Sequence, residues 1–193
     1  MIPGSATPVA LGRLCKDRRM FYSHRMIYSH RMGLSGWSCL VLVFGMGAAC
    51  AEPQPSAAML EPVHELTSFM STLPAGEHPR MFATHRLCII ENFPPFLFCG
   101  ARAAWQWESG FRAHSKDEGL SELAVHFDAA HDFSQVGRRV YFSLPTTWTG
   151  RTHGRTFEER GAWSFVLVRQ PSAGWRIAGY GWGVTAYTEQ AGT

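Results

Sequence analysis

The sequence lacks the short motifs that mark several common kinds of active site. It contains no His-Glu-x-x-His pair, no paired Cys-x-x-Cys and no serine nucleophile elbow. The segment Gly179-Tyr-Gly-Trp-Gly183 is rich in glycine, but it follows a predicted strand and does not open a helix, as a dinucleotide-binding loop must. These absences argue against zinc peptidases, serine hydrolases and dinucleotide enzymes, and we predict neither a metal site nor a cofactor.

Basic side chains are scarce outside the first 51 residues. Residues 1–51 hold six of the 18 lysines and arginines but one of the 15 acidic residues, so residues 52–193 carry 12 basic and 14 acidic side chains and a net charge of −2. A stripe of basic side chains is the usual requirement for binding phosphates along a nucleic acid. We therefore expect no nucleic-acid partner.

Charge is absent altogether from residues 34–49, an apolar run preceded by Arg25 and Arg31. The run ends in a small-x-small pattern at Ala51, which is typical of a secretory signal peptide cleaved after that residue. We expect the protein to be exported, either to the periplasm or as a secreted protein. The alternative is an uncleaved anchor over residues 34–50, but this stretch is shorter than the roughly 20 apolar residues that a membrane span needs.

The segment before this run contains Tyr-Ser-His-Arg-Met twice, at 22–26 and 28–32. Two copies of five residues are too short to stack as a repeat architecture. Either this is a basic tail, or translation starts at an internal methionine; the candidate starts are Met1, Met20, Met26 and Met32. Residues 1–51 are thus interpreted as an extension with a signal peptide, 52–56 as a spacer, 57–185 as the folded domain and 186–193 as a tail.

Apolar residues recur at three- and four-residue steps over 57–73, which predicts an amphipathic helix. A second, shorter helix is predicted over 78–85 and a third over 100–119. In the third helix, Trp105 is assigned to the apolar face. Trp107 lies two helical positions further along and is expected to face outward, toward a partner subunit.

Between the second and third helices, strands are predicted at 87–90 and 96–98, joined by a proline-containing turn as a hairpin. Beyond the third helix, apolar and polar residues alternate over long stretches, which predicts antiparallel strands joined by short turns. The expected strands cover residues 123–133, 140–148, 156–169 and 175–184. Helices on one side of such a sheet define an α+β domain.

Two of the five cysteines, Cys88 and Cys99, lie outside the leader. If Asn92–Pro95 forms the hairpin tip, positions that sum to 187 face each other, so Cys88 lies opposite Cys99. In an exported protein this pair can form a disulfide. Two inert thiols in the core are the other interpretation, and the sequence leaves both open.

Several phrases, in this order of elements, resemble the SnoaL-like and ketosteroid-isomerase-like group within the nuclear transport factor 2 superfold. They are Ile89-Ile-Glu-Asn-Phe-Pro-Pro-Phe, Gly100-x-x-Ala-x-x-Trp, Gly161-x-Trp-x-x-Val-Leu and Gly174-Trp-Arg-Ile. The resemblance covers residues 57–185. It implies a strongly curved antiparallel sheet, wrapped as a cone around about three helices with an internal apolar cavity, and a homodimer.

The resemblance also implies where a catalytic base would lie. In ketosteroid isomerases a carboxylate at the end of the first strand removes a proton beside a carbonyl group. The matching position is Glu91 or Asn92, depending on a one-residue shift, and an amide cannot take the proton. Strand parity decides whether Glu91 faces a cavity, where burial would raise its pKa, or solvent. The first helix contains no tyrosine to serve as an oxyanion donor.

A second candidate acid or base is His131, on the apolar side of its predicted strand, although a histidine there is commonly a core residue. Tyr141 is a candidate hydrogen-bond donor from the sheet, or a cross-strand packing residue. The density of tryptophan suggests a cavity for flat apolar molecules. The expected pocket residues are Asn92, Phe93, Phe96, Trp105, Tyr141, Trp148 and Trp182.

Three functions are compatible with these features. We expect an exported domain that binds a small apolar or aromatic molecule in a hydrophobic pocket without catalysis. The alternative is an isomerase, cyclase or dehydratase that acts on a small apolar carbonyl compound through Glu91 or His131. A third interpretation is a dimeric module whose sheet binds another protein. Contact with a membrane is expected only if the leader stays uncleaved.

Overall fold

A computed structural model describes residues 52–76 and 78–190 of the chain. Contacts along the chain divide it into two units, Met1–Ala51 and Glu52–Thr193, and all the described helices and strands belong to the second. The signal peptide, the repeated pentapeptide and the candidate start codons lie outside the described residues. No helix in the described ranges is long and apolar enough to cross a membrane.

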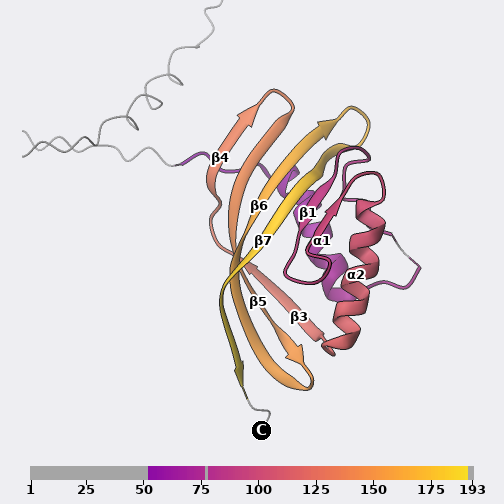
Figure 1. The fold of residues 1–193 in the computed structure, drawn as a ribbon. Coiled ribbons are helices and arrows are strands. Elements are labelled where there is room, and N and C mark those ends of the chain that lie inside the picture. Colours follow the sequence, from indigo (N-terminus) through magenta and orange to yellow (C-terminus); the bar gives the residue numbers. More distant parts are fainter. Residues whose placement is uncertain (1–51, 77, 191–193) are drawn as a thin grey trace, which may run out of the picture. The chain divides into compact units, whose positions relative to one another are not determined.

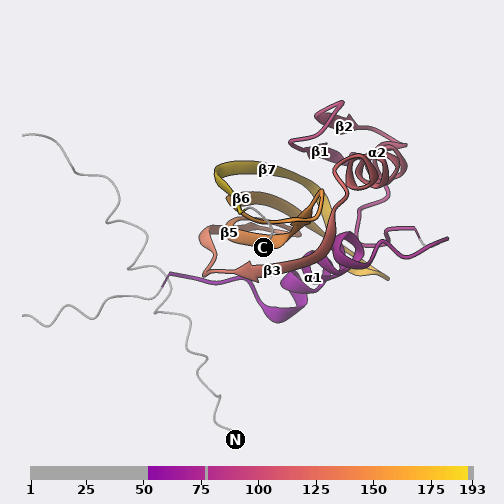
Figure 2. The ribbon, with the colours of Figure 1, turned by 90° about the horizontal axis from the view of Figure 1, so that it is seen from below.

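The described chain is an α+β unit of two helices and a large, curved, unclosed sheet, which confirms the expected fold class (Figure 1). Both helices lie to one side of the sheet (Figure 2). The elements are α1 (Ala57–Thr72), β1 (Cys88–Ile90), β2 (Leu97–Cys99), α2 (Ala103–Asp117), β3 (Ser121–Phe127), β4 (His131–Val136), β5 (Arg139–Thr152), β6 (Arg155–Gln170) and β7 (Gly174–Gln190).

The sheet has the strand order β2-β1-β7-β6-β5-β3, with β4 also paired to β5. Neighbouring strands of the sheet run antiparallel, with one exception: β1 and β7 run parallel. The sheet is therefore mixed, not wholly antiparallel as the sequence suggested. The parallel pair joins the short β1–β2 hairpin to β7, and between β1 and β7 the chain passes through β2, α2 and the strands β3 to β6.

The predicted first helix is confirmed as α1, whose apolar stripe packs into the core through Val63, Leu66 and Met70. The predicted helix over 78–85 is wrong. The backbone there pairs with β7: the Ala83 N–H donates to the Ile177 carbonyl at 2.8 Å, and the Ile177 N–H donates to the Met81 carbonyl at 2.9 Å. Hydrogen bonds to a neighbouring strand satisfy the backbone polar groups as well as a helix would.

The predicted third helix is confirmed as α2, but its buried face differs from the expected one. The side chains of Ala103, Trp107 and Phe111 are buried at four-residue steps. Trp107 is 0% exposed and Trp105 is 58% exposed. Residues two apart lie on nearly opposite sides of a helix, so only one tryptophan could face the core, and the sequence analysis chose the wrong one.

The predicted strand over 123–133 is broken in two, because β3 ends at Phe127 and β4 begins at His131. Ala130 is buried in the break, and its backbone forms two hydrogen bonds with the Gln54 side chain. Gln54 Nε2 donates to the Ala130 carbonyl at 2.9 Å, and the Ala130 N–H donates to Gln54 Oε1 at 3.1 Å. The segment interpreted as a spacer is thus attached to the sheet. At the other end of the chain, β7 continues past residue 185 to Gln190, so part of the expected tail is strand.

The long strands bend where β6 and β7 shift register, between Arg160 and Gly161 and between Val166 and Leu167. Such bulges increase the local twist and bend of a strand. A Cβ atom at Gly161 would lie 2.6 Å from the Trp182 ring and closer still to the Gly183 carbonyl oxygen. Glycine at 161 therefore lets the Trp182 ring lie across the inner face of the bend.

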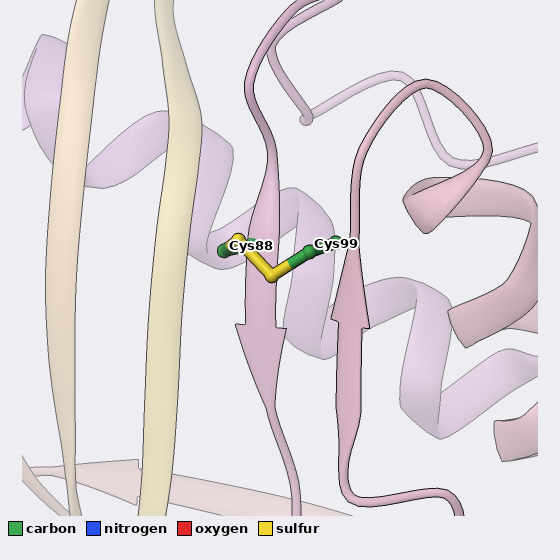
Figure 3. Close-up of a disulfide and its surroundings, with 2 residues drawn as sticks. All are labelled: Cys88 and Cys99. Carbon is green, nitrogen blue, oxygen red and sulfur yellow. A yellow bond between two sulfur atoms is a disulfide. The ribbon is translucent and has the colours of Figure 1, made fainter.

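The β1–β2 hairpin pairs Cys88 with Cys99, the register expected from the sequence. The two residues form a disulfide, with their Cα atoms 4.2 Å apart (Figure 3). Beyond the disulfide the hairpin closes immediately: the Glu91 N–H donates to the Phe96 carbonyl at 3.0 Å. The disulfide holds a pair of strands that are each only three residues long.

We expect reduction of the Cys88–Cys99 disulfide to lower the free energy of unfolding by about 2–3 kcal/mol, because the bond closes a short loop and removes chain entropy from the unfolded state. Urea denaturation with and without reductant measures the change. The double variant Cys88→Ser/Cys99→Ser is the control and should show no response to reductant. Equal stability of the oxidised and reduced wild-type protein would contradict the expectation.

Candidate active site

Glu91 directly follows β1, where the side chains alternate between the two faces of the sheet. Cys88 and Ile90 are exposed, whereas Ile89 is 0% and Glu91 6% exposed. The alternation therefore turns the Glu91 carboxylate inward and leaves the neighbouring Asn92 on the exposed side. Of the two residues that the sequence could not separate, Glu91 is the buried one, whereas Asn92 is exposed and also lines the cavity described below.

Three elements meet at the Glu91 carboxylate. Its Oε1 accepts a hydrogen bond from Trp107 Nε1 of α2 at 2.9 Å and another from the Tyr180 hydroxyl of β7. Tyr180 is well placed because β1 pairs in parallel with β7 and Ile89 lies opposite Tyr180 in the ladder. A helix, the first strand of the β1–β2 hairpin and a central strand are thus joined through one oxygen atom.

Burial raises the pKa of Glu91 from its ordinary value of 4.5 to about 7. The hydrogen bonds from Tyr180, Trp107 and the Asn92 backbone N–H act against this rise, and the charge of Glu159 adds to it. Burial, followed by the Glu91 charge, raises the pKa of Tyr180 well above 10, so its hydroxyl stays protonated and donates. Near neutral pH the carboxylate is populated in both its charged and its neutral form, as a proton-transfer group requires.

A cavity of about 240 Å³ lies against Glu91. Most of its walls are aromatic and aliphatic side chains from α1, α2 and the inner face of the sheet. It is lined by Met70, Glu91, Asn92, Phe93, Phe111, His114, Glu118, Leu120, Leu123, Trp148, Thr152, Phe157, Glu159, Trp163, Trp182 and Tyr187.

A second carboxylate, Glu159 of β6, lies on the wall of the same cavity. Its Oε1 accepts a hydrogen bond from Trp182 Nε1 at 2.9 Å, and burial raises its pKa. His114 of α2 stacks on the Phe93 ring with 5.1 Å between ring centroids, and burial lowers the pKa of this imidazole. The cavity therefore combines two carboxyl groups whose pKa values are raised by burial with an imidazole whose pKa is lowered by burial.

The sequence matches no protein-family model and no curated protein. Among solved structures, the hexachlorocyclohexane dehydrochlorinase LinA-type3 from Novosphingobium barchaimii aligns with a TM-score of 0.56 at 10% identity, over 71% of this chain and 90% of that one. A scytalone dehydratase-like protein from Novosphingobium aromaticivorans gives 0.54 at 12% identity, over 70% and 87% of the two chains. A nuclear transport factor 2-like superfamily protein from Salmonella enterica gives 0.54 at 17%, over 65% and 87%.

The chain has the nuclear transport factor 2-like fold. Identities this low establish the fold and carry no activity with it. In this nuclear transport factor 2-like domain, four of the seven expected pocket residues line the cavity: Asn92, Phe93, Trp148 and Trp182.

The other three expected pocket residues lie elsewhere. Phe96 is 55% exposed at the tip of the hairpin, and Trp105 is 58% exposed on the outer face of α2. Tyr141 is 40% exposed and lines a different groove, together with Cys88 and Val166. The errors at Trp105 and Tyr141 each follow from assigning a side chain to the wrong face of its element.

His131 does not reach the cavity. Its side chain is 58% exposed, and Nδ1 lies 3.8 Å from a carboxylate oxygen of Glu52. The strand break at Asp128–Ala130 reverses the parity on which the inward assignment depended, because β4 begins a new register with β5. The break places Ala130 inside and turns His131 outward.

The site residues that escaped the sequence analysis include Trp107, His114, Glu159 and Tyr180. Two of them have a signal in the sequence. Glu159 shares a strict two-residue alternation with Trp163, Phe165 and Leu167, all on the inner face of β6. Tyr180 and Trp182 alternate with glycines, which places both large side chains on one face of β7.

Glu91 should make the stability of the nuclear transport factor 2-like domain depend on pH. Because the pKa of Glu91 is raised from 4.5 to about 7 on folding, its neutral form stabilises the native state at low pH, and this contribution is lost as the pH rises through about 7. Relative to Glu91→Gln, the wild-type protein should lose about 3 kcal/mol of unfolding free energy between about pH 4 and pH 8. Chemical denaturation of both proteins across this range measures the difference.

Two tryptophan variants supply a matched comparison for this titration. Trp107→Phe removes a donor that favours the charged carboxylate, so the Glu91 titration should move to higher pH. Trp105→Phe changes an exposed ring on the same helix and should leave the pH of the Glu91 titration unchanged. Parallel pH profiles for wild type and Glu91→Gln would show that Glu91 titrates alike in the folded and unfolded chains.

Proposed function

We propose that this domain binds a small organic molecule in the Glu91 cavity and that Glu91 transfers a proton to and from it. The observation that carries this proposal is a carboxylate buried on the wall of a cavity, held by two donors, with a pKa of about 7. A general base works best when its pKa lies near the working pH. The reaction class is isomerisation or elimination on a carbon acid beside a carbonyl group.

The surrounding side chains have different roles in this reaction. Tyr180 and Trp107 hold Oε1 and so orient the carboxylate, which makes them positioning residues. Ionised Glu91 removes a proton from a substrate carbon, and the electron pair moves onto the carbonyl oxygen. Asn92 and His114 line the cavity and carry N–H groups that can donate to this oxygen. In an isomerisation the electron pair returns from the oxygen and Glu91 gives the proton to another carbon. In an elimination the returning pair expels a leaving group from the neighbouring carbon, and Glu91 gives the proton to the departing group.

The names of two structures that share the fold support this reaction class, because dehydrochlorination and dehydration are both eliminations. This is an analogy between folds and does not extend to either substrate. The support that comes from this chain itself is the buried carboxylate and the small volume of the cavity. A cavity of about 240 Å³ is smaller than the roughly 300–1,000 Å³ typical of sites for drug-sized ligands.

Binding without catalysis is the second candidate. Both the Tyr180 hydroxyl and the Trp107 N–H donate to Glu91 in this structure. In that state neither group is free to stabilise an enolate oxygen, and much of the effect of such sites comes from preorganised donors. If Asn92 and His114 do not supply those donors, the pocket binds its ligand without catalysing a reaction.

Hydrogen exchange into carbon acids separates the two candidates. We expect the protein to accelerate incorporation of deuterium from D₂O at the α-carbon of members of a panel of small cyclic ketones, followed by NMR. Glu91→Gln should lower the rate by about 10²–10⁴-fold. His131→Ala, which changes the exposed candidate base, is the matched control and should keep the wild-type rate. Retained exchange in Glu91→Gln would contradict the assigned base, and binding of ketones without exchange in wild type would favour the noncatalytic pocket.

We further propose that the domain works in an oxidising compartment after export. The support is the signal-like leader of the sequence together with the Cys88–Cys99 disulfide, since such bonds persist mainly outside the cytosol. In cells, rapid alkylation before lysis should leave both thiols unlabelled, and the protein should fractionate with exported proteins and start after residue 51. Labelled thiols in a cytosolic, full-length protein would contradict this location.

A further inference from the structure

The charged groups on the cavity wall are all acidic. Glu91, Glu118 and Glu159 line it, and no lysine or arginine is among the lining residues. Within residues 52–76 and 78–190, Glu91 and Glu159 form no ion pair with a basic side chain, and their side-chain partners are the neutral donors described above. The buried Glu91 and the partly buried Glu159 therefore lack a counter-charge from the described chain.

Aromatic rings enclose the same space. Phenylalanine, tryptophan and tyrosine supply seven of the lining residues: Phe93, Phe111, Trp148, Phe157, Trp163, Trp182 and Tyr187. A cation near the face of such a ring is attracted by the negative charge of the π system, and the attraction is stronger where water is excluded. An aromatic enclosure with carboxylates is the arrangement that recognises alkylammonium groups.

We propose that the ligand of this pocket is a small organic cation, a quaternary ammonium or protonated amine on a short hydrocarbon, with its charge placed between Glu159, Glu91 and the surrounding rings. A cation supplies the missing counter-charge, whereas an anion would meet three carboxylates. A neutral molecule of the same shape would gain from burial of apolar area alone. The inference names the ligand class of the proposed function and rests on the same cavity being its site.

The other charged groups near the lining residues leave this balance intact. Arg155 pairs with Glu189 at 2.8 Å, and His153 lies 3.4 Å from Glu118. From α2 the cavity is also faced by His114, next to Asp117 and Glu118, and burial lowers the pKa of this imidazole. From β7 it is faced by the Tyr187 phenol, whose pKa is raised by burial and by the neighbouring glutamates. The basic groups near the site thus face acidic partners of their own.

A bound cation should also change the protonation of the site. Its charge favours the ionised forms of Glu91 and Glu159, whose pKa values are raised by burial. Binding therefore competes with protons, and affinity should rise as the pH increases through about 7, the pKa of Glu91. For a catalytic site this has a useful consequence, because a cationic substrate would bring the base into its reactive form.

Three probes of nearly the same shape test the charge directly: choline, the neutral 3,3-dimethyl-1-butanol and the anionic 3,3-dimethylbutanoate. Titration calorimetry with the full chain at pH 8 should show choline binding about tenfold more tightly than the neutral alcohol, with the anion weakest. Choline affinity should fall when the pH is lowered to 5, and affinity for the alcohol should not. Equal or weaker binding of choline than of either isostere, or no binding of choline, overturns the inference.

Variants identify the groups responsible. Glu159→Gln should reduce choline affinity about tenfold and leave affinity for the neutral alcohol unchanged. Glu122→Gln alters an exposed carboxylate outside the cavity and should change neither. Unchanged choline binding in Glu159→Gln would overturn the placement of the charge. Because choline has no carbonyl group, these measurements are independent of proton transfer: deuterium exchange through Glu91 without a preference for choline would remove this inference and keep the proposed function.

Discussion

The organisation of the site depends on the hydrogen bonds that the buried Glu91 carboxylate accepts. One of its oxygens accepts hydrogen bonds from Trp107 on α2 and from Tyr180 on β7, so the edge hairpin, the second helix and a long strand converge on one buried group. Burying a carboxylate is costly unless hydrogen bonds or charges compensate for lost water. Here the donors compensate in part, and the raised pKa reflects the cost that remains. A buried carboxylate whose pKa stays raised is a better indicator of function than one whose charge is fully balanced by its partners.

The hairpin that presents Glu91 has little structure of its own. Each of its strands is three residues long, yet it is tied to β7 by the parallel ladder and across itself by the Cys88–Cys99 disulfide (Figure 3). These constraints act within a few residues of the carboxylate and limit how far it can move. The Glu91 side of the site is thus tied to its neighbours by covalent and hydrogen bonds, and further walls of the cavity are formed by side chains of the bent strands β5, β6 and β7.

Much of the fold was predictable because alternation and helical spacing persist over long segments. α1, the hairpin register and the long strands all follow from such patterns. The failures lie where a pattern is short or where two assignments are equally periodic. Residues 78–85 have apolar side chains at helical spacing, but their backbone pairs with β7. Trp105 and Trp107 satisfy the same pattern with opposite faces, and His131 changes side because a three-residue break resets the strand.

The sequence by itself determined the first helix, the hairpin register and the resemblance to a nuclear transport factor 2-like fold, and it narrowed the base to two adjacent residues, since local periodicity and short phrases encode these. Only the tertiary structure decided that Glu91 points inward and that Tyr180, some 90 residues away, is its partner. It also decided that Glu159 shares the cavity. The reason is physical: a carboxylate acquires its pKa and its partners from groups that come together only when distant strands pair.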